Sequence, residues 1–172
     1  MPSPCYVSIT GTNQGLITRN SGSTHATGER AIYSHSDEML IQSVAHGCYL
    51  PIDIQSGVVT GQRKHKPLKL TTDLNPAIPL LYNALCTGEM LEKITLTWWR
   101  TSIYGKQENF FDTILTNARV CRIDVLMPCS NEKKAKPFTQ FVHIYFTYRK
   151  IEWLHKVCGT LAIDDWRKPL EA

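Results

Sequence analysis

The side chains that could do chemistry are scattered along this sequence, and their spacing disfavours most catalytic and metal sites. No two of the six cysteines form a CxxC pair, and no histidine pairs with another histidine or cysteine at ligand spacing. We expect the cysteines to be small buried apolar residues, with a disulfide framework or a metal site as less favoured alternatives. The cysteines are Cys5, Cys48, Cys86, Cys121, Cys129 and Cys158.

Two acidic stretches deserve separate consideration as reactive sites. His35-Ser36-Asp37-Glu38 could offer three ligands to a metal ion, but a solvated turn leading into a strand is favoured. Asp164-Asp165 could suggest paired acids, yet adjacent residues of a strand point to opposite faces, which favours a solvated tail. Because the chain also lacks a GxSxG elbow, a P-loop and an HExxH motif, we predict no catalytic residues, no metal and no cofactor.

A basic cluster precedes the middle of the chain and raises the question of nucleic acid. The cluster comprises Arg63, Lys64, Lys66 and Lys69, and Trp98, Trp99 and Trp153 are the aromatic residues that could stack on bases. The tryptophans follow strand alternation, which favours core packing, and the net charge is only +4. A charged face, or one that meets an acidic patch on a neighbouring subunit, is therefore preferred over a nucleic-acid site.

Length and hydropathy favour one soluble domain spanning residues 1–172. A chain of 172 residues buries roughly 70% of the surface that its unfolded form exposes, so its core needs no metal or disulfide. No apolar run approaches the ~18 residues of a membrane span, and we expect no membrane insertion. The N-terminal residues lack a basic stretch followed by an apolar one, which predicts a protein made in the cytoplasm and exported, if at all, without a Sec-type signal peptide.

The elements that position these side chains are mostly strands, organised around one long hairpin. Two alternating runs, Leu91–Tyr104 and Gln107–Met127, meet at Gly105-Lys106, where glycine suits the first position of a type II′ turn. The apolar phase slips at Trp99 and again between Val120 and Ile123, which indicates bulges and a coiled sheet. A hairpin this long and bent predicts a barrel or a sandwich.

Further strands and one helix complete the expected fold. The helix Pro76–Thr87 has Asn75 as its N-cap, Pro76 at its first position and Gly88 as its stop. The strand Phe138–Tyr148 is apolar on both faces, which is typical of a strand between two layers or one covered by another subunit. The remaining segments are strands at Pro4–Thr10, Asp37–Ile52 and Arg63–Thr72, a short strand at Leu16–Thr18, loops at Gly11–Ser36 and Met127–Pro137, and a tail at Cys158–Ala172.

The segment Pro51–Gln62 reads as a protruding arm or wide hairpin. Val58 and Val59 have little to pack against within such a tip, so we expect them to contact something else. Together with the two-faced strand, the arm predicts that the domain assembles with copies of itself.

Several strings, in order along the whole chain, resemble the haemolysin-coregulated protein (Hcp) family, the inner-tube subunit of bacterial type VI secretion systems. The strings are Pro4–Ile9, Asp37–Leu40, Ser56-Gly57, Gly61–Arg63, His65–Pro67, Pro79–Leu85, Gly88-Glu89, Arg100–Ser102, Gly105–Glu108, Phe110-Phe111, Tyr148–Trp153 and Asp164–Arg167. The resemblance implies a mainly β fold, a two-sheet β-barrel with one flanking α-helix like that of phage tail tubes. It also implies homohexameric rings stacked into a tube, with sheath proteins outside, a spike or tip protein, and effector cargo in the lumen. No enzymatic activity is expected, since the sequence ends at Ala172 without a toxin extension.

By analogy, the resemblance assigns assembly roles to three regions. Ring stacking is expected of the arm and the hairpin tip, namely Ser56, Gly57, Val58, Val59, Gly61, Gln62, Arg63, Gly105, Lys106, Gln107 and Glu108. The outer face of the helix, with Asn83, Thr87 and Glu89, is expected to meet the sheath. The loops Asn20–Arg30 and Asn131–Lys136 and the additional Cys48, Cys121 and Cys158 depart from the family pattern. If an added cysteine faces an interface, oxidation could lock rings or tubes after export.

Two other functions remain open beside the mechanical tube. The same ring could act mainly as an effector chaperone or receptor. A stand-alone enzyme or lectin-like binder on a β scaffold is a third interpretation, because a fold does not exclude a grafted site.

Overall fold

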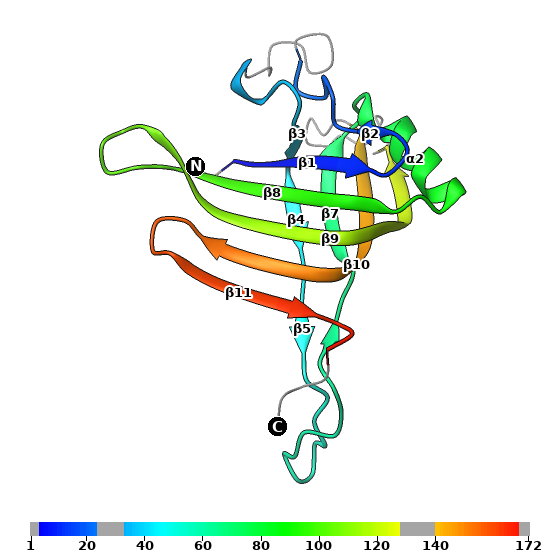
Figure 1. The fold of residues 1–172 in the computed structure, drawn as a ribbon, viewed down its shortest axis with the longest axis vertical. Coiled ribbons are helices and arrows are strands. Elements are labelled where there is room, and N and C mark those ends of the chain that lie inside the picture. The colour runs from blue at the N-terminus through cyan, green and yellow to red at the C-terminus, as the bar shows by residue number, and fades with distance from the viewer. Residues whose placement is uncertain (1–3, 24–32, 128–139, 169–172) are drawn as a thin grey trace, which may run out of the picture.

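The structure, a computed structural model, describes residues 4–23, 33–127 and 140–168 (Figure 1). It is mainly β, with one α-helix among the described residues. In chain order the elements are β1 (Cys5–Gly11), β2 (Gly15–Leu16), the 3-10 helix η2 (Tyr33–His35), β3 (Met39–Ile41), β4 (Ser43–Ala45), β5 (Cys48–Tyr49), β6 (Lys64–His65), β7 (Leu68–Asp73), α2 (Ala77–Thr87), β8 (Leu91–Thr101), β9 (Gln107–Leu126), β10 (Phe141–His155) and β11 (Thr160–Asp165). Within the described ranges, no helix is both long and apolar enough to cross a membrane.

A coiled antiparallel sheet forms the body of the molecule. Its strands lie in the order β2-β1-β8-β9-β10-β7-β4, and β11 pairs with β10. The predicted phase slips are confirmed as register shifts: β8 shifts between Trp98 and Trp99, and β9 carries an extra residue, Cys121, opposite Tyr145 and Phe146 of β10. These bulges let long strands coil while they keep one apolar face toward the core.

One segment, residues 39–45, pairs with strands near both edges of this sheet. β3 pairs with β1, and β4 pairs with β7 only one residue later, so the chain crosses from one edge of the sheet to the other. The backbone N–H of Gln42 donates to Thr71 O at 2.8 Å at the crossing. The strand candidate at Asp37–Ile52, whose apolar phase changes between Ile41 and Val44 and again before Tyr49, is divided into the three short strands β3, β4 and β5. Each of these pieces pairs with a different partner. The described pairings do not close into a ring, so a barrel is not established by them.

The core lies on the inner face of the curled sheet. Val142, Ile144 and Phe146 of β10 are fully buried, and the apolar stripe of α2 packs Ile78 and Leu81 into the same cluster. The alternate residues of β10 are half-buried or exposed, and Lys69 Nζ lies 5.7 Å from the centre of the Tyr145 ring. β10 thus has the apolar inner face that alternation predicted, with β9 on one side and β7 and β11 on the other.

The helix α2 begins and ends close to the predicted residues. The Asn75 Oδ1 accepts a hydrogen bond from the Ala77 N–H at 3.0 Å, while Pro76 takes the capping position that had been assigned to Asn75. Gly88 adopts the left-handed conformation (φ 69°) and its N–H reaches the Leu85 carbonyl at 3.3 Å. Local capping chemistry therefore sets both ends of the helix.

The turn of the central hairpin differs from the prediction. Gly105 has φ 74° but follows Ile103 and Tyr104 in a three-residue loop, closed by the Ser102 N–H donating to Lys106 O at 2.8 Å. A left-handed residue at the third position is typical of such loops, so the two-residue type II′ turn is wrong. The apolar pattern at Ile103 and Tyr104 resembles a strand, although both residues belong to the turn.

The C-terminal segment also corrects a prediction. Thr160–Asp165 is not a solvated tail but the strand β11, paired antiparallel with β10 from Lys150↔Asp165 to His155↔Thr160. The missed signal was the Gly159 turn (φ 68°) after a long strand, which returns the chain beside β10.

Candidate assembly surfaces

The arm extends from the body as a self-contained hairpin, the segment below β5 in Figure 1. β5 and β6 pair at its root, and Ile52 bridges Val59 further out. At its tip the Asp53 carboxylate accepts from the Ser56 hydroxyl at 2.7 Å and from the Gln55 N–H at 3.1 Å. The Ser56 hydroxyl and then the Gln55 N–H lower the pKa of Asp53, since both donate to the ionised carboxylate. The tip is therefore shaped by its own hydrogen bonds, with Gly57 (φ 68°) supplying the tight turn.

Four aliphatic side chains of the arm face solvent. Val58 and Val59, which the sequence singled out, are 60% and 49% exposed, as the lack of local packing predicted. Ile54 is 94% exposed and was missed, because a lone apolar residue in a polar loop gives no periodic signal. Ile52 is exposed on the same arm. Gly61 and Gln62 lie on the return limb and are exposed.

Arg63 plays a different part from the rest of the arm. Its Nε donates to Asp164 Oδ2 at 2.6 Å, and its Nη2 lies 2.6 Å from Oδ1 of the same carboxylate. Asp164 also accepts from His65 Nε2 at 2.5 Å. Burial opposes ionisation of Asp164, but the bonds from Arg63 and His65 outweigh it and lower its pKa. Arg63 thus anchors the root of the arm to β11, and its expected part in ring stacking stays a prediction. Asp164 accepts these hydrogen bonds within the fold and is not part of a solvated tail.

Tyr148 of β10 contacts His65, the histidine that donates to Asp164, and also His46. The Tyr148 hydroxyl lies 2.9 Å from His65 Nδ1 and 2.6 Å from His46 Nε2, and burial raises the pKa of Tyr148. Sequence reasoning did not connect these residues, because they come from β4–β6 and β10. Cys48 Sγ lies 3.4 Å from His65 Nε2. Among the described residues, no group of three or more His, Cys, Asp or Glu is placed to hold a metal ion.

The hairpin tip is the second exposed projection and points away from the body in another direction than the arm (Figure 1). Ile103 and Tyr104 are 93% and 84% exposed, and they were missed as candidate contacts. Gly105 and Lys106 share the tip. The predicted residues Gln107 and Glu108 begin β9, where Glu108 accepts from Arg100 Nε at 2.7 Å. The structure does not bring the two predicted stacking regions together.

The outer face of α2 carries two of the three predicted sheath residues. Asn83 and Thr87 are exposed, and the Thr87 hydroxyl donates to Asn83 O at 2.8 Å. Glu89 is a correction, because it is only 5% exposed. Its Oε1 accepts from the N–H groups of Asn13 (2.8 Å) and Gln14 (3.0 Å), and its Oε2 accepts from Gln14 Nε2 (2.7 Å). Burial raises the pKa of Glu89, but the Gln14 and Asn13 donors outweigh it and the net shift is downward.

The remaining sequence predictions have mixed outcomes. Trp98 and Trp153 are partly buried and pack against the core, as alternation predicted. The burial predicted for the cysteines is wrong for most of those described: Cys5 is buried, whereas Cys48, Cys86, Cys121 and Cys158 are exposed free thiols. Cysteine content does not reveal whether a residue falls on a bulge or on the outer side of a helix. Cys129 and the loops 24–30 and 131–136 lie outside the described residues.

Comparisons with known proteins agree over the whole chain. The sequence model of the family described as "Type VI secretion system effector, Hcp" matches residues 6–155. The Major exported protein of Pseudomonas aeruginosa is 43% identical over 171 residues, covering 99% of each chain. A crystal structure of an Hcp protein has a TM-score of 0.91 at 39% identity, covering 96% of this chain and 99% of its own. The secreted protein Hcp3 from Pseudomonas aeruginosa has a TM-score of 0.79 at 37% identity, covering 95% and 99%. Fold, sequence and length together place this chain in the Hcp family of type VI secretion system proteins.

Proposed function

We propose that this chain, one domain spanning residues 1–172, is the repeating subunit of a type VI secretion inner tube. Six copies close into a ring, rings stack, and the tube is exported with effectors in its lumen. The observation that carries the proposal is a folded domain, in a family with an exported member, that presents two projections with exposed apolar side chains to solvent. A ring that serves mainly as an effector chaperone or receptor is the second candidate, because the same assembly would enclose a cargo.

The arm is suited to contact the next ring. Fully burying one valine or isoleucine side chain contributes about 1.5–3 kcal/mol, so Ile54, Val58 and Val59 together offer a useful stacking contact. The hydrogen bonds of Asp53 hold the tip in shape, which lowers the ordering cost of association. The exposed Ile103 and Tyr104 add the hairpin tip to the same role on a ring face.

Ring closure draws on the edges of the sheet. Among the described strands β11 pairs only with β10, and its free edge carries Leu161 and Ile163, which are 56% and 51% exposed. A free apolar edge is usually covered by another chain, and a head-to-tail contact with a closing rotation makes a ring. The segment 39–45, which touches both edges of the sheet, supports the related proposal that the domain works as a two-sheet β-barrel.

Partners follow from these surfaces. The outer face of α2, with Asn83 and Thr87 but without the buried Glu89, is proposed to meet sheath proteins, and the tube end to meet the spike or tip protein. The chain is made in the bacterial cytoplasm and leaves it without a signal peptide, for the extracellular space or a target cell. It binds no nucleic acid and acts without catalysis or a cofactor.

The proposal is tested by the double substitution Val58→Asp and Val59→Asp. Light scattering after size exclusion should still give a ring mass, while negative-stain microscopy should show fewer and shorter tubes. A matched control, Gln55→Asp with Thr60→Asp, adds the same charge to the same arm and keeps its aliphatic residues. Tubes of normal length in the valine variant, or a wild-type chain that stays monomeric at high concentration, would contradict the proposal.

Two further experiments separate the partners. Lysines at Asn83 and Thr87 should impair sheath assembly around otherwise normal rings, and an unchanged sheath would reject that surface. Effectors that are stabilised on co-expression, in cells where no tubes form, would favour the chaperone ring over the mechanical tube.

A further inference from the structure

One hydroxyl group joins two histidines at the root of the arm. The Tyr148 hydroxyl, on β10, lies 2.9 Å from Nδ1 of His65 and 2.6 Å from Nε2 of His46. His65 belongs to β6 and His46 to the segment between β4 and β5, so this histidine junction ties both limbs of the arm root to the sheet. Tyr148 and the side chain of His65 are buried, which leaves little room for water to replace a lost partner.

The carboxylate of Asp164 fixes one proton of His65. Its Oδ2 lies 2.5 Å from His65 Nε2, and an ionised carboxylate only accepts, so Nε2 carries a proton whether the ring is neutral or charged. His65 Nδ1 is therefore the nitrogen that gains or loses a proton. When it is bare, it accepts the Tyr148 O–H, and the Tyr148 oxygen accepts the His46 Nε2–H. When it is protonated, it donates to the Tyr148 oxygen, and the O–H turns toward a bare His46 Nε2.

The histidine junction has no satisfied arrangement for two charged rings. With protons on both His65 Nδ1 and His46 Nε2, both nitrogens donate to one oxygen and the Tyr148 proton is left without an acceptor. Burial raises the pKa of Tyr148, so the hydroxyl keeps that proton. A buried donor without a partner costs free energy, and the two ring centroids are only 6.0 Å apart, where like charges repel.

The charged groups around the histidine junction do not offset a second proton. Asp164 of β11 faces the His65 ring, but its carboxylate is already paired with Arg63 at 2.6 Å. The next carboxylate of β11, that of Asp165, lies 3.3 Å from Arg149 Nε. Each of these negative charges therefore has a cation beside it before either histidine is protonated.

The neighbours nearest the arm are neutral. Cys48 Sγ of β5 lies 3.4 Å from His65 Nε2, and burial raises the pKa of this thiol. The rings of Trp153 and Trp166 lie 6.4 Å and 5.4 Å from the His65 ring. In these surroundings burial first, and then the charge of His65, lower the pKa of His46. The direction agrees with the count of hydrogen-bond partners.

We propose that the histidine junction is an acid-sensitive attachment of the arm to the sheet. It holds while at most one of the two rings is charged. It opens when a second proton binds, because the opened root lets water solvate both rings. Opening separates the β5–β6 root from β10, while the hydrogen bonds of Asp53 still hold the tip in shape. The arm is therefore fixed at neutral pH and released in mildly acidic solution, the range in which histidines titrate.

The direction of the pH effect follows from His46. Its folded-state pKa is lowered, so the stability that it contributes is complete above the unfolded pKa of about 6.5 and is lost as pH falls through the folded pKa. Uptake of one proton on opening favours the open root by up to about tenfold for each pH unit. The loss that Asp164 causes begins only near its own unfolded pKa of about 3.9, so the two effects occur in separate pH ranges.

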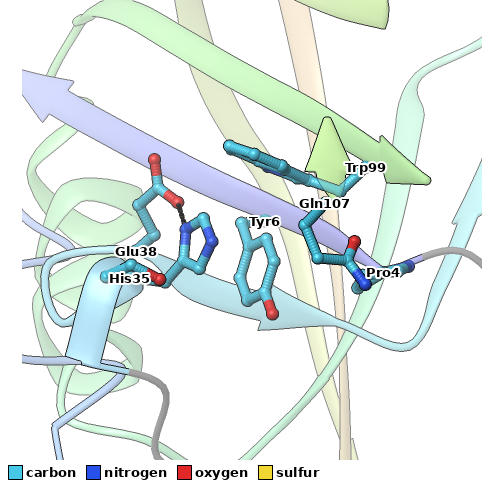
Figure 2. A pocket seen from close by; sticks show the side chains of 7 residues that line it. Pro4, Tyr6, His35, Glu38, Trp99 and Gln107 are labelled. Carbon is cyan, nitrogen blue, oxygen red and sulfur yellow. Dashed lines mark hydrogen bonds and ion pairs between the residues drawn. The ribbon is translucent and has the colours of Figure 1, made fainter. Parts of the chain in front are cut away.

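A second histidine beside a carboxylate shows what the shared hydroxyl adds. His35 lies in a cavity of about 380 Å³ that Tyr6 and Trp99 also line, and Figure 2 shows its ring against Glu38. His35 Nδ1 is 2.6 Å from Glu38 Oε2. Here one ring faces one carboxylate, so a proton on the ring strengthens the contact. Acid is therefore expected to release the arm root and to leave this part of the fold in place.

The attachment itself does not depend on the tube proposal, but its consequence for assembly does. With the arm as the stacking contact, tubes are expected to shorten on acidification, because a released arm pays a larger ordering cost when it binds the next ring. Hydrogen exchange of the full chain reports the attachment even where no tubes form. Failure of the attachment and failure of the tube are therefore separate results.

Amide hydrogen exchange of the full chain at several pH values between about 7.5 and 5 measures the attachment. The rates are expressed as protection factors, which removes the intrinsic pH dependence of exchange. The Lys66 N–H, which donates to Gly47 O at 2.7 Å across the root, should lose at least about tenfold protection over this range. The amide of Ile144, in the core part of β10, should keep its protection.

The variant His46→Gln identifies the group responsible. Glutamine can donate to or accept from the Tyr148 hydroxyl but cannot become charged, so the acid-induced loss of protection at Lys66 should disappear. His143→Gln is the matched control. His143 is a partly buried histidine of β10 that contacts Thr71 Oγ1 at 2.9 Å, outside the histidine junction, and its variant should respond to acid as wild type does.

Protection at Lys66 that does not fall in wild type, or an acid-induced loss that persists in a folded His46→Gln variant, would overturn the proposal. If His46→Gln does not fold, an NMR titration of the histidine ring nitrogens in wild type decides instead. Protonation of the second ring at the pH where Lys66 loses protection supports the proposal. His46 and His65 both charged in a chain whose root stays protected would overturn it.

Discussion

Replacing Asp164 by asparagine tests whether one carboxylate holds the arm to the body. The substitution keeps the size of the side chain and removes its charge from Arg63 and His65. The Asp164 side chain is 20% exposed, and those of Arg63 and His65 are 15% and 1% exposed, so water replaces the lost contacts poorly. The contacts of Asp164 with Arg63 and His65 therefore resemble a buried ion pair more closely than a surface one.

The expected loss of unfolding free energy in Asp164→Asn follows from the three contacts of the Asp164 carboxylate, two with Arg63 and one with His65. A hydrogen bond that involves a charged group contributes about 1.5–3 kcal/mol net. Asparagine keeps one acceptor oxygen but turns an N–H₂ group toward a donor, so we expect a loss of about 2–3 kcal/mol instead of the full sum of three bonds. For a domain of this size each kcal/mol lowers Tm by about 2–4 °C.

Urea unfolding at fixed protein concentration measures this loss, because association of the folded chain would otherwise shift the midpoint. Asp124→Asn is the matched control: Asp124 pairs with Arg122, whose side chain is 65% exposed, and a surface pair of this kind contributes little. Hydrogen exchange should also quicken at the β5–β6 root in Asp164→Asn. A cost no larger than that of the control, with unchanged exchange at the root, would refute the view that Asp164 anchors the arm.

Three further predictions concern the same chain. The folded-state pKa of Asp164 is depressed, so the stability that its ionised carboxylate contributes is complete above the unfolded pKa of about 3.9 and is lost as pH falls through the folded pKa. The stability of Asp164→Asn, measured by urea unfolding at decreasing pH, should therefore lack this part of the acid-induced decline. Parallel stability curves for wild type and variant would contradict the prediction. Glu89→Gln should cost about 1–3 kcal/mol in urea unfolding because two backbone N–H groups lose a charged acceptor, whereas the exposed Glu92→Gln should be near neutral; equal effects would argue against a structural Glu89. Gly105→Ala should cost about 1–2 kcal/mol from its left-handed backbone, and Gly61→Ala, where an added Cβ meets only Pro51 Cγ at 3.7 Å, serves as the comparison; no difference between the two would reject the strain.

Much of the fold could be predicted because its signals are local. Alternation identified β10 and the long hairpin, and the phase slips identified the bulges at Trp98/Trp99 and Cys121. Capping chemistry at Asn75 and Gly88 placed the helix within a residue. Each of these signals depends on neighbours a few positions away, which the sequence displays directly.

The errors share a different cause. Asp164 and Glu89 looked like solvated or outward-facing acids, yet each accepts hydrogen bonds from residues about 75 to 100 positions away. Ile103 and Tyr104 continued a strand pattern but belong to a turn. The cysteines were expected inside, and the bulge at Cys121 and the outer side of α2 at Cys86 place two of them on the surface.

The sequence by itself determined the long hairpin of β8 and β9, the strand β10, the helix, the projecting apolar arm and, through its motifs, the family. Only the tertiary structure decided that Arg63 fastens the arm to β11, that Glu89 is buried, and that Tyr6, His35, Glu38 and Trp99 enclose a cavity. Periodicity states which face of an element is apolar, but it does not state which distant segment covers that face. That choice depends on how the curled sheet brings its strands together, because long-range contacts are fixed by packing and not by neighbouring residues.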